Sequence, residues 1–232
     1  MMNKKNLLLL ILIWCLLSCR NQEVDSKIWL HRANDLVAMQ IGEHNYKGME
    51  IDIHFNDSLQ TLIVKHDYED TTILLLDEWL SHLQNTNMGL WLDLKNLTPE
   101  NKYSIVKELT SLRQKYHLRK KIYVESSNYA DLDIFAKKYF LTSYYTPWFN
   151  ESSTEAELTQ ARLEISDAIA CPWIKAISGR YFQYEKMKEW FPRQKKLLWY
   201  IGCDTTLRND YISIALQDKT IDVLLVSDEA CD

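Results

Sequence analysis

The stretch GMEIDIHF, residues 48–55, has the length and apolar content of a buried strand but carries three ionisable residues. Side chains alternate along a strand, so Glu50, Asp52 and His54 share one face and hydrophobic residues take the other. A buried carboxylate without a partner is strongly unfavourable. This face therefore requires a metal ion, a cationic side chain or water, and we expect His54 to form a hydrogen bond at the rim.

Further ionisable residues stand at the ends of other expected strands. They are His31 and Arg32 after the first strand, His66 and Asp67 after a short additional strand, and Asp93 and Lys95 on one face of a later strand. Converging carboxylates repel one another unless a hard cation lies between them, and oxygen ligands favour Mg²⁺ or Ca²⁺. Histidines can serve as general acid and base near neutral pH. The combination indicates chemistry on a phosphodiester, with cationic side chains holding the phosphate.

Apolar segments of strand length alternate with segments of helical periodicity along most of the chain. The expected strands are Ile28–Ala33, Gly48–Phe55, Gly89–Lys95, Lys121–Ser126, Phe140–Trp148, Ala168–Trp173, Lys196–Gly202 and Ile221–Asp228, with an additional short strand at Leu59–Asp67. The expected helices include Thr98–Tyr116, Tyr129–Lys138, Ser153–Ile165, Tyr181–Trp190 and Leu207–Leu216. Eight strands with interposed helices predict a (β/α)8 barrel without its closing helix, and a doubly wound open sheet is the alternative. In such a barrel the polar residues at the strand ends meet at one rim.

The N-terminus has the pattern of a secretory signal. Lys4 and Lys5 precede the apolar run Leu7–Leu17, which is shorter than the roughly 20 residues that span a bilayer. Its end, Leu-Leu-Ser-Cys, resembles a bacterial lipobox, which implies cleavage after residue 18 and lipid attachment to Cys19. A plain secretory signal and a buried N-terminal helix are the alternatives. We expect a tether over residues 19–26 and one barrel domain over 27–232, lipid-anchored on the extracytoplasmic side of a bacterial cell envelope.

Charge, length and cysteine content further limit the partners, the domain organisation and the metals that we expect. The net charge is −5, with 27 basic and 32 acidic side chains, which argues against a nucleic-acid partner. The length suits one large α/β domain, and we expect a monomer. The late cysteines form no C-x-x-C pair, so zinc is not expected. Cys203 and Cys231 follow the last two expected strands, and whether they form a disulfide is left open.

The order of the motifs resembles the glycerophosphodiester phosphodiesterase family of the phospholipase C-like phosphodiesterase barrels. The matching segments are His31-Arg32, GMEIDIHF, the strand that ends in His66-Asp67, LWLDLKNL, LLWYIGCD and IDVLLVSDEA. Asp93 stands where most of the family has Glu, and its Asp-Leu-Lys is similar to the sphingomyelinase D branch. Ala33 replaces the family's usual Gly, and the short spacing from His66 to Asp93 leaves no room for a helical insertion found in bacterial members.

The resemblance implies a role for each matching residue. It implies His31 and His66 as the catalytic pair, Glu50, Asp52 and Asp93 as ligands of one Mg²⁺ or Ca²⁺ ion, and Arg32 and Lys95 as phosphate contacts. It implies a hydrolase or lyase that acts on a small-molecule or lipid phosphodiester of the glycerophosphodiester or phospholipid type. Two alternatives stay open: a non-catalytic barrel that binds a phospholipid headgroup or glycan, and a metal-free barrel in which Lys95 pairs with the carboxylates.

Overall fold

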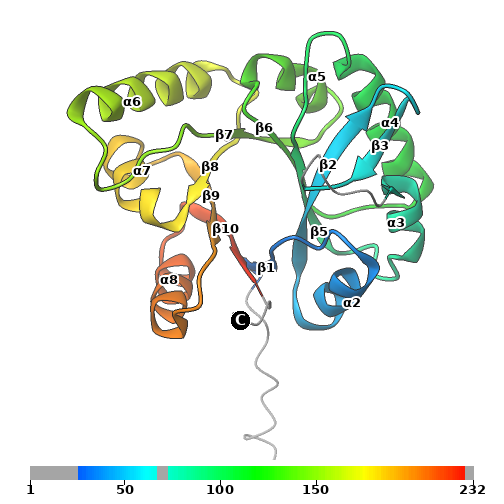
Figure 1. The fold of residues 1–232 in the computed structure, drawn as a ribbon, viewed down its shortest axis with the longest axis horizontal. Coiled ribbons are helices and arrows are strands. Elements are labelled where there is room, and N and C mark those ends of the chain that lie inside the picture. The colour runs from blue at the N-terminus through cyan, green and yellow to red at the C-terminus, as the bar shows by residue number, and fades with distance from the viewer. Residues whose placement is uncertain (1–25, 67–72, 228–232) are drawn as a thin grey trace, which may run out of the picture.

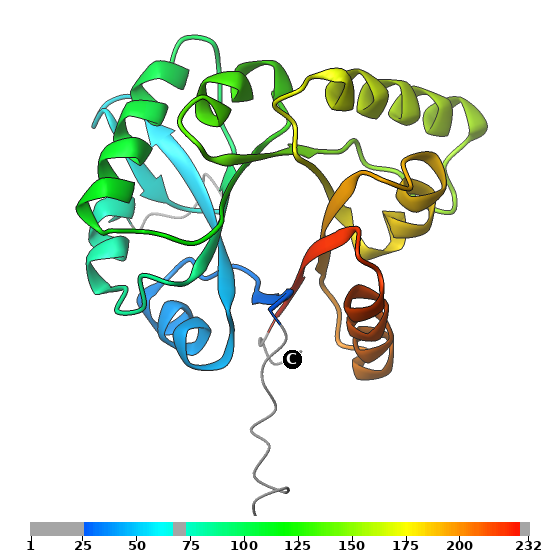
Figure 2. The same ribbon diagram turned by 180° about the vertical axis from the view of Figure 1, so that it is seen from behind.

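A computed structural model of the chain describes residues 26–66 and 73–227. The expected signal and tether up to residue 25, Asp67 and Cys231 lie outside these residues. Eight parallel strands form the barrel: β1 (Ile28–Leu30), β2 (Gly48–Asn56), β5 (Gly89–Leu94), β6 (Ile122–Ser126), β7 (Leu141–Tyr145), β8 (Ala176–Arg180), β9 (Lys195–Tyr200) and β10 (Ile221–Val226). Each strand pairs with the next in this order, and β1 pairs with both β10 and β2. The ring is therefore closed (Figures 1 and 2), as the sequence predicts.

Helices surround the strands on the outside of the ring (Figure 1). They are α2 (Leu36–Asn45), α3 (Leu76–His82), α4 (Lys102–Lys115), α5 (Asp133–Ala136), α6 (Glu155–Ala170), α7 (Tyr184–Trp190) and α8 (Thr205–Gln217), with short 3₁₀ turns at Tyr129–Leu132 and Tyr181–Gln183. The strands β3 (Thr61–Val64) and β4 (Leu74–Leu75) extend β2 as an antiparallel meander. Within the described residues, no helix follows β10. None of the described helices is long and apolar enough to cross a membrane.

One expected strand is wrong. Residues Ala168–Trp173 were expected to be extended, but α6 continues to Ala170 and the strand is β8 instead. A capping box between Thr154 and Glu157 begins the helix, and the buried residues Ala161, Ile165 and Ala168 continue its apolar face at helical spacing. The true strand, AISGR, is rich in small residues that have low β-propensity, so its sequence signal is weak.

A cluster of large side chains fills the inside of the barrel. Trp29, Trp91 and Trp199 are its largest members. Trp29 lies across Gly48 and Gly89, where an added Cβ would come within 2.3 and 2.4 Å of its ring. These two glycines let the indole close the N-terminal end of the barrel, so the polar pocket described below lies at the opposite end.

Candidate active site

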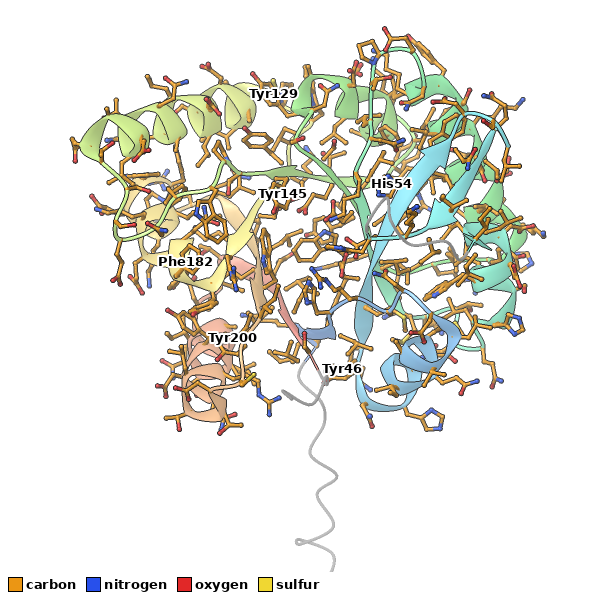
Figure 3. All side chains as sticks on the ribbon, in the orientation of Figure 1. Tyr46, His54, Tyr129, Tyr145, Phe182 and Tyr200 are labelled. Carbon is orange, nitrogen blue, oxygen red and sulfur yellow. The ribbon has the colours of Figure 1, made fainter. Side chains whose placement is uncertain are left out.

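A polar pocket of about 70 Å³ opens at the C-terminal ends of the barrel strands. The seven residues to which the family resemblance assigns a role all line it: His31, Arg32, Glu50, Asp52, His66, Asp93 and Lys95. Trp91, Glu125, Tyr145 and Trp199 also line it. Figure 3 shows the side chains that fill the ring, and labels His54 on β2 and Tyr145 on β7.

The carboxylates of Glu50, Asp52 and Asp93 form the centre of the pocket. Asp52 on β2 is in register with Asp93 on β5, and an oxygen from each of the three carboxylates lies within 4.8 Å of the others. Burial, and then the charge of Asp52, raises the pKa of Glu50 well above its usual range. Burial also raises the pKa of Asp93, against the opposing effect of Lys95. Buried carboxylates that disfavour their own ionisation in this way are a suitable ligand set for a hard divalent cation.

Lys95 joins two of these carboxylates. Its Nζ lies 2.6 Å from Asp52 Oδ1 and also pairs with Asp93. Although burial opposes ionisation of Asp52, the charge and hydrogen bond of Lys95 outweigh burial and lower the pKa of Asp52. Asn34 contributes by donating from Nδ2 to Asp52 Oδ2 at 2.7 Å and accepting from the Asp52 backbone N–H. A single ammonium group balances one negative charge, so the cluster keeps capacity for a metal ion.

The loop between β1 and α2 places the first histidine and the arginine. The Ala33 N–H donates to Glu50 O, and the Asp35 carboxylate caps α2, so both ends of this short loop are fixed. Arg32 has a left-handed backbone with φ of 56°, and its N–H donates to Glu50 Oε2 at 2.7 Å. Strained backbone of this kind is frequent at functional sites, where the surrounding structure holds it in place.

The two histidines line the same pocket as the carboxylates. His31 Nε2 lies 3.9 Å from Glu50 Oε2, and its Nδ1 lies 3.3 Å from Ser227 Oγ. Burial, and then the charge of Arg32, lowers the pKa of His31 to about 3, so its ring is neutral at pH 7. Arg32 Nη2 lies 2.7 Å from His66 Nε2, which accepts when the proton is on Nδ1.

His54 stands apart from the carboxylate cluster. It is buried further along β2, hydrogen-bonds to the backbone of His66, and has its pKa lowered by burial. It is not one of the residues that could hold a metal ion together.

Glu125 is the main pocket residue that the sequence motifs did not reveal. It lies on β6 in register with Asp93, is 1% exposed, and its Oε2 has no hydrogen-bond partner among the described residues. Burial, and then the charge of Asp93, raises its pKa well above the usual range, while the hydroxyls of Ser143 and Ser178 oppose this shift. Glu125 comes two residues after Tyr123 in an expected strand, so the two share one face, and this spacing was the one sequence feature that could have indicated its place.

Comparison with protein-family models gives no match, and no curated protein sequence matches either. Among solved structures, a glycerophosphodiester phosphodiesterase from Parabacteroides distasonis has a TM-score of 0.60 at 14% identity, over 87% of this chain and 93% of that one. An Oleispira antarctica phosphodiesterase in complex with the product sn-glycerol-3-phosphate has a TM-score of 0.59 at 13% identity, over 86% and 92%.

A third similar structure is a calcium-dependent phosphoinositol-specific phospholipase C from Pseudomonas sp. Its TM-score is 0.55 at 9% identity, and the match covers 87% of this chain and 88% of that one. At these identities the likeness concerns the fold. The chain therefore shares the (β/α)8 barrel fold of these phosphodiesterase and phospholipase C structures.

Proposed function

We propose that the protein is a metal-dependent phosphodiesterase that acts on glycerophosphodiester- or phospholipid-type substrates. The observation that carries the proposal is one pocket that contains three clustered carboxylates, two histidines and two cationic side chains. The phosphodiesterase structures with the same fold, one of them in complex with sn-glycerol-3-phosphate, support this class of substrate.

Glu50, Asp52 and Asp93 would hold one divalent cation, Mg²⁺ or Ca²⁺. When bound, such an ion supplies positive charge that stabilises the negative charge growing on a phosphoryl oxygen. The calcium dependence of the phospholipase C with this fold is compatible with this donor set. The proposal does not depend on which of the two ions is used.

The chain's own residues would bind the phosphate and move protons around it. Lys95 and Arg32 provide cationic contacts to the phosphate oxygens. The neutral ring of His31 can accept a proton from the attacking hydroxyl while His66 protonates the leaving oxygen. The reverse assignment requires that His31 first be protonated in the substrate complex. The attacking group can be water, which gives hydrolysis, or a neighbouring hydroxyl of the substrate, which gives a cyclic phosphate.

The proposed setting is a lipid-anchored monomer on the extracytoplasmic side of a bacterial envelope, with Cys19 as the anchored residue. Its support is the N-terminal sequence pattern. Mass spectrometry of the exported protein tests this, because lipidation adds acyl mass to a peptide that begins at Cys19.

The first test of the site measures metal binding and its effect on stability and turnover. We expect added Mg²⁺ or Ca²⁺ to raise the melting temperature of the protein, because a ligand that binds only the folded state stabilises it. Asp93→Asn should abolish this shift and the turnover, whereas Asp210→Asn on the exposed surface of α8 should change neither. Calorimetry with each metal, and turnover with and without EDTA on a panel of glycerophosphodiesters and phospholipids, measure both quantities.

The same assays separate the alternatives. Metal binding without turnover of any phosphodiester would favour a barrel that binds a headgroup or glycan. If EDTA changes neither melting nor turnover, Lys95 alone balances the carboxylates and the metal proposal is wrong.

A further inference from the structure

The two ends of the barrel differ strongly in charge. Eight segments lead into the barrel strands at its N-terminal end: residues 26–27, 46–47, 83–88, 116–121, 137–140, 171–175, 191–194 and 218–220. Together they carry ten Lys or Arg residues and one carboxylate, Asp218. The described connections at the opposite end carry three Lys or Arg residues and five carboxylates. Because the whole chain is acidic, the excess of positive charge at one end does not follow from its composition.

We call the N-terminal end of the barrel, formed by these eight segments, the basic face. Most of its cations are exposed, including Lys47, Arg119, Lys120, Lys175 and Lys219, and none of these five forms an ion pair with a described carboxylate. Asp222 at the start of β10 is shared by Lys121 and Lys195, at 3.0 and 3.1 Å. The basic face therefore keeps a clear excess of positive charge.

A cavity of about 810 Å³ opens in the basic face. Lys27, Lys47, Lys120 and Lys121 line it, together with Trp29 and Asp222. The Lys27 ammonium donates to the carbonyls of Ala215 and Asp218, and Lys121 pairs with Asp222, so the cations available to a ligand here are those of Lys47 and Lys120.

The chain before the barrel leaves from this same face, because Ser26 lines the cavity. Six residues lie between Cys19 and Ser26, and the seven extended steps from one to the other span at most about 25 Å. A lipid on Cys19 would therefore keep the basic face close to a membrane. This favours a lipid surface over other anionic partners.

We propose that the basic face docks on a membrane surface that contains anionic lipid, so that the active-site pocket opens on the side away from that membrane. Anionic headgroups attract each nearby lysine, and the attraction is screened by salt. The lipid on Cys19 would hold the protein at the membrane, and the basic face would set which side of the barrel lies against it. In this orientation the pocket takes its substrate from the aqueous side.

The test uses an unacylated chain that begins at Arg20, because the closed barrel and its core lie within residues 26–227. It should sediment with phosphatidylcholine vesicles that contain about one third phosphatidylglycerol, but not with phosphatidylcholine alone. Binding should be strong at about 50 mM salt and lost at about 500 mM. Lys47→Glu/Lys120→Glu/Lys175→Glu should weaken it at least about tenfold.

The matched control is Lys107→Glu/Arg162→Glu/Lys186→Glu, which reverses three exposed cations on the outer helices and makes the same change in net charge. It should bind vesicles like the unmodified chain. Equal loss in both variants, no binding at low salt, or equally tight binding of duplex DNA would overturn the proposal. Turnover of a soluble glycerophosphodiester should be the same in all three proteins, so the absence of turnover would contradict the proposed function and leave the vesicle result intact.

Discussion

At the scale of single residues, Arg32 connects the parts of the pocket. Its backbone N–H binds Glu50, while its guanidinium lies 2.7 Å from the ring of His66. Its charge also helps to lower the pKa of His31, after the larger effect of burial. Arg32 therefore binds a proposed metal ligand, contacts the ring of His66 and helps to lower the pKa of His31.

The two histidines are the residues on which the proposed chemistry depends most directly. His31→Ala and His66→Ala should each lower turnover by about 10²-fold or more, which is the usual scale of general acid and base catalysis. His117→Ala, at an exposed position after α4, should leave turnover unchanged. Steady-state kinetics with circular dichroism of each variant separates lost chemistry from lost fold. Full activity in either pocket variant removes that histidine from the mechanism.

At the scale of elements, the sequence predicts strands best where a motif or a β-branched run accompanies them. The segments with His31, Glu50, Asp52 and Lys95 were placed correctly because polar residues interrupt apolar strands at fixed spacing. β8 was misplaced, since its small residues resemble a loop and the preceding helix is apolar enough to resemble a strand. Glu125 was missed because its partners, Asp93, Ser143 and Ser178, come from three other strands.

The contact between Trp29 on β1 and Gly89 on β5 leads to a prediction about the stability of the barrel. The glycines of the described chain have no positive φ, so alanine at Gly89 is allowed by the backbone and would by itself stabilise the strand. Its Cβ would however lie 2.4 Å from the Trp29 ring, which is buried and hydrogen-bonded through Nε1 to Ser26 O. Gly89→Ala should therefore lower the free energy of unfolding by about 1–3 kcal/mol.

Denaturant unfolding measures this change. Gly202→Ala is the matched control, because it lies at an exposed position where the nearest atom to a new Cβ is the Tyr200 hydroxyl at 3.0 Å. It should have a much smaller effect. Unchanged or increased stability of Gly89→Ala would mean that Trp29 does not hold the position described here.

At the scale of the whole molecule, the barrel places the two proposed functions at opposite ends. A packed interior that includes three tryptophans lies between the two ends of the barrel. The carboxylates and histidines lie at one end, and most of the loop lysines lie at the other. A closed barrel allows this because the loops at each end vary without disturbing the strands between them. Substrate access and attachment to a surface can then be changed independently.

The last prediction concerns the strands that close the barrel. Cys203 follows β9 and is disulfide-bonded, whereas Cys171 is a free thiol. We expect the partner to be Cys231, which lies outside the described residues, because lipidation would make the Cys19 thiol unavailable. Such a bond would close a loop that contains α8 and β10, and a loop of this length contributes about 3–4 kcal/mol. It suits an exported protein, since disulfides persist in oxidising compartments.

Non-reducing peptide mapping of the exported protein tests the pairing. We expect a linked Cys203–Cys231 peptide, and we expect Cys203→Ser and reduction to lower the melting temperature to the same extent, while Cys171→Ser leaves it unchanged. Alkylation of both Cys203 and Cys231 without reductant would exclude the bond. A Cys203–Cys19 peptide would contradict both the pairing and the lipid anchor, because the same sulfur cannot carry a lipid and a disulfide.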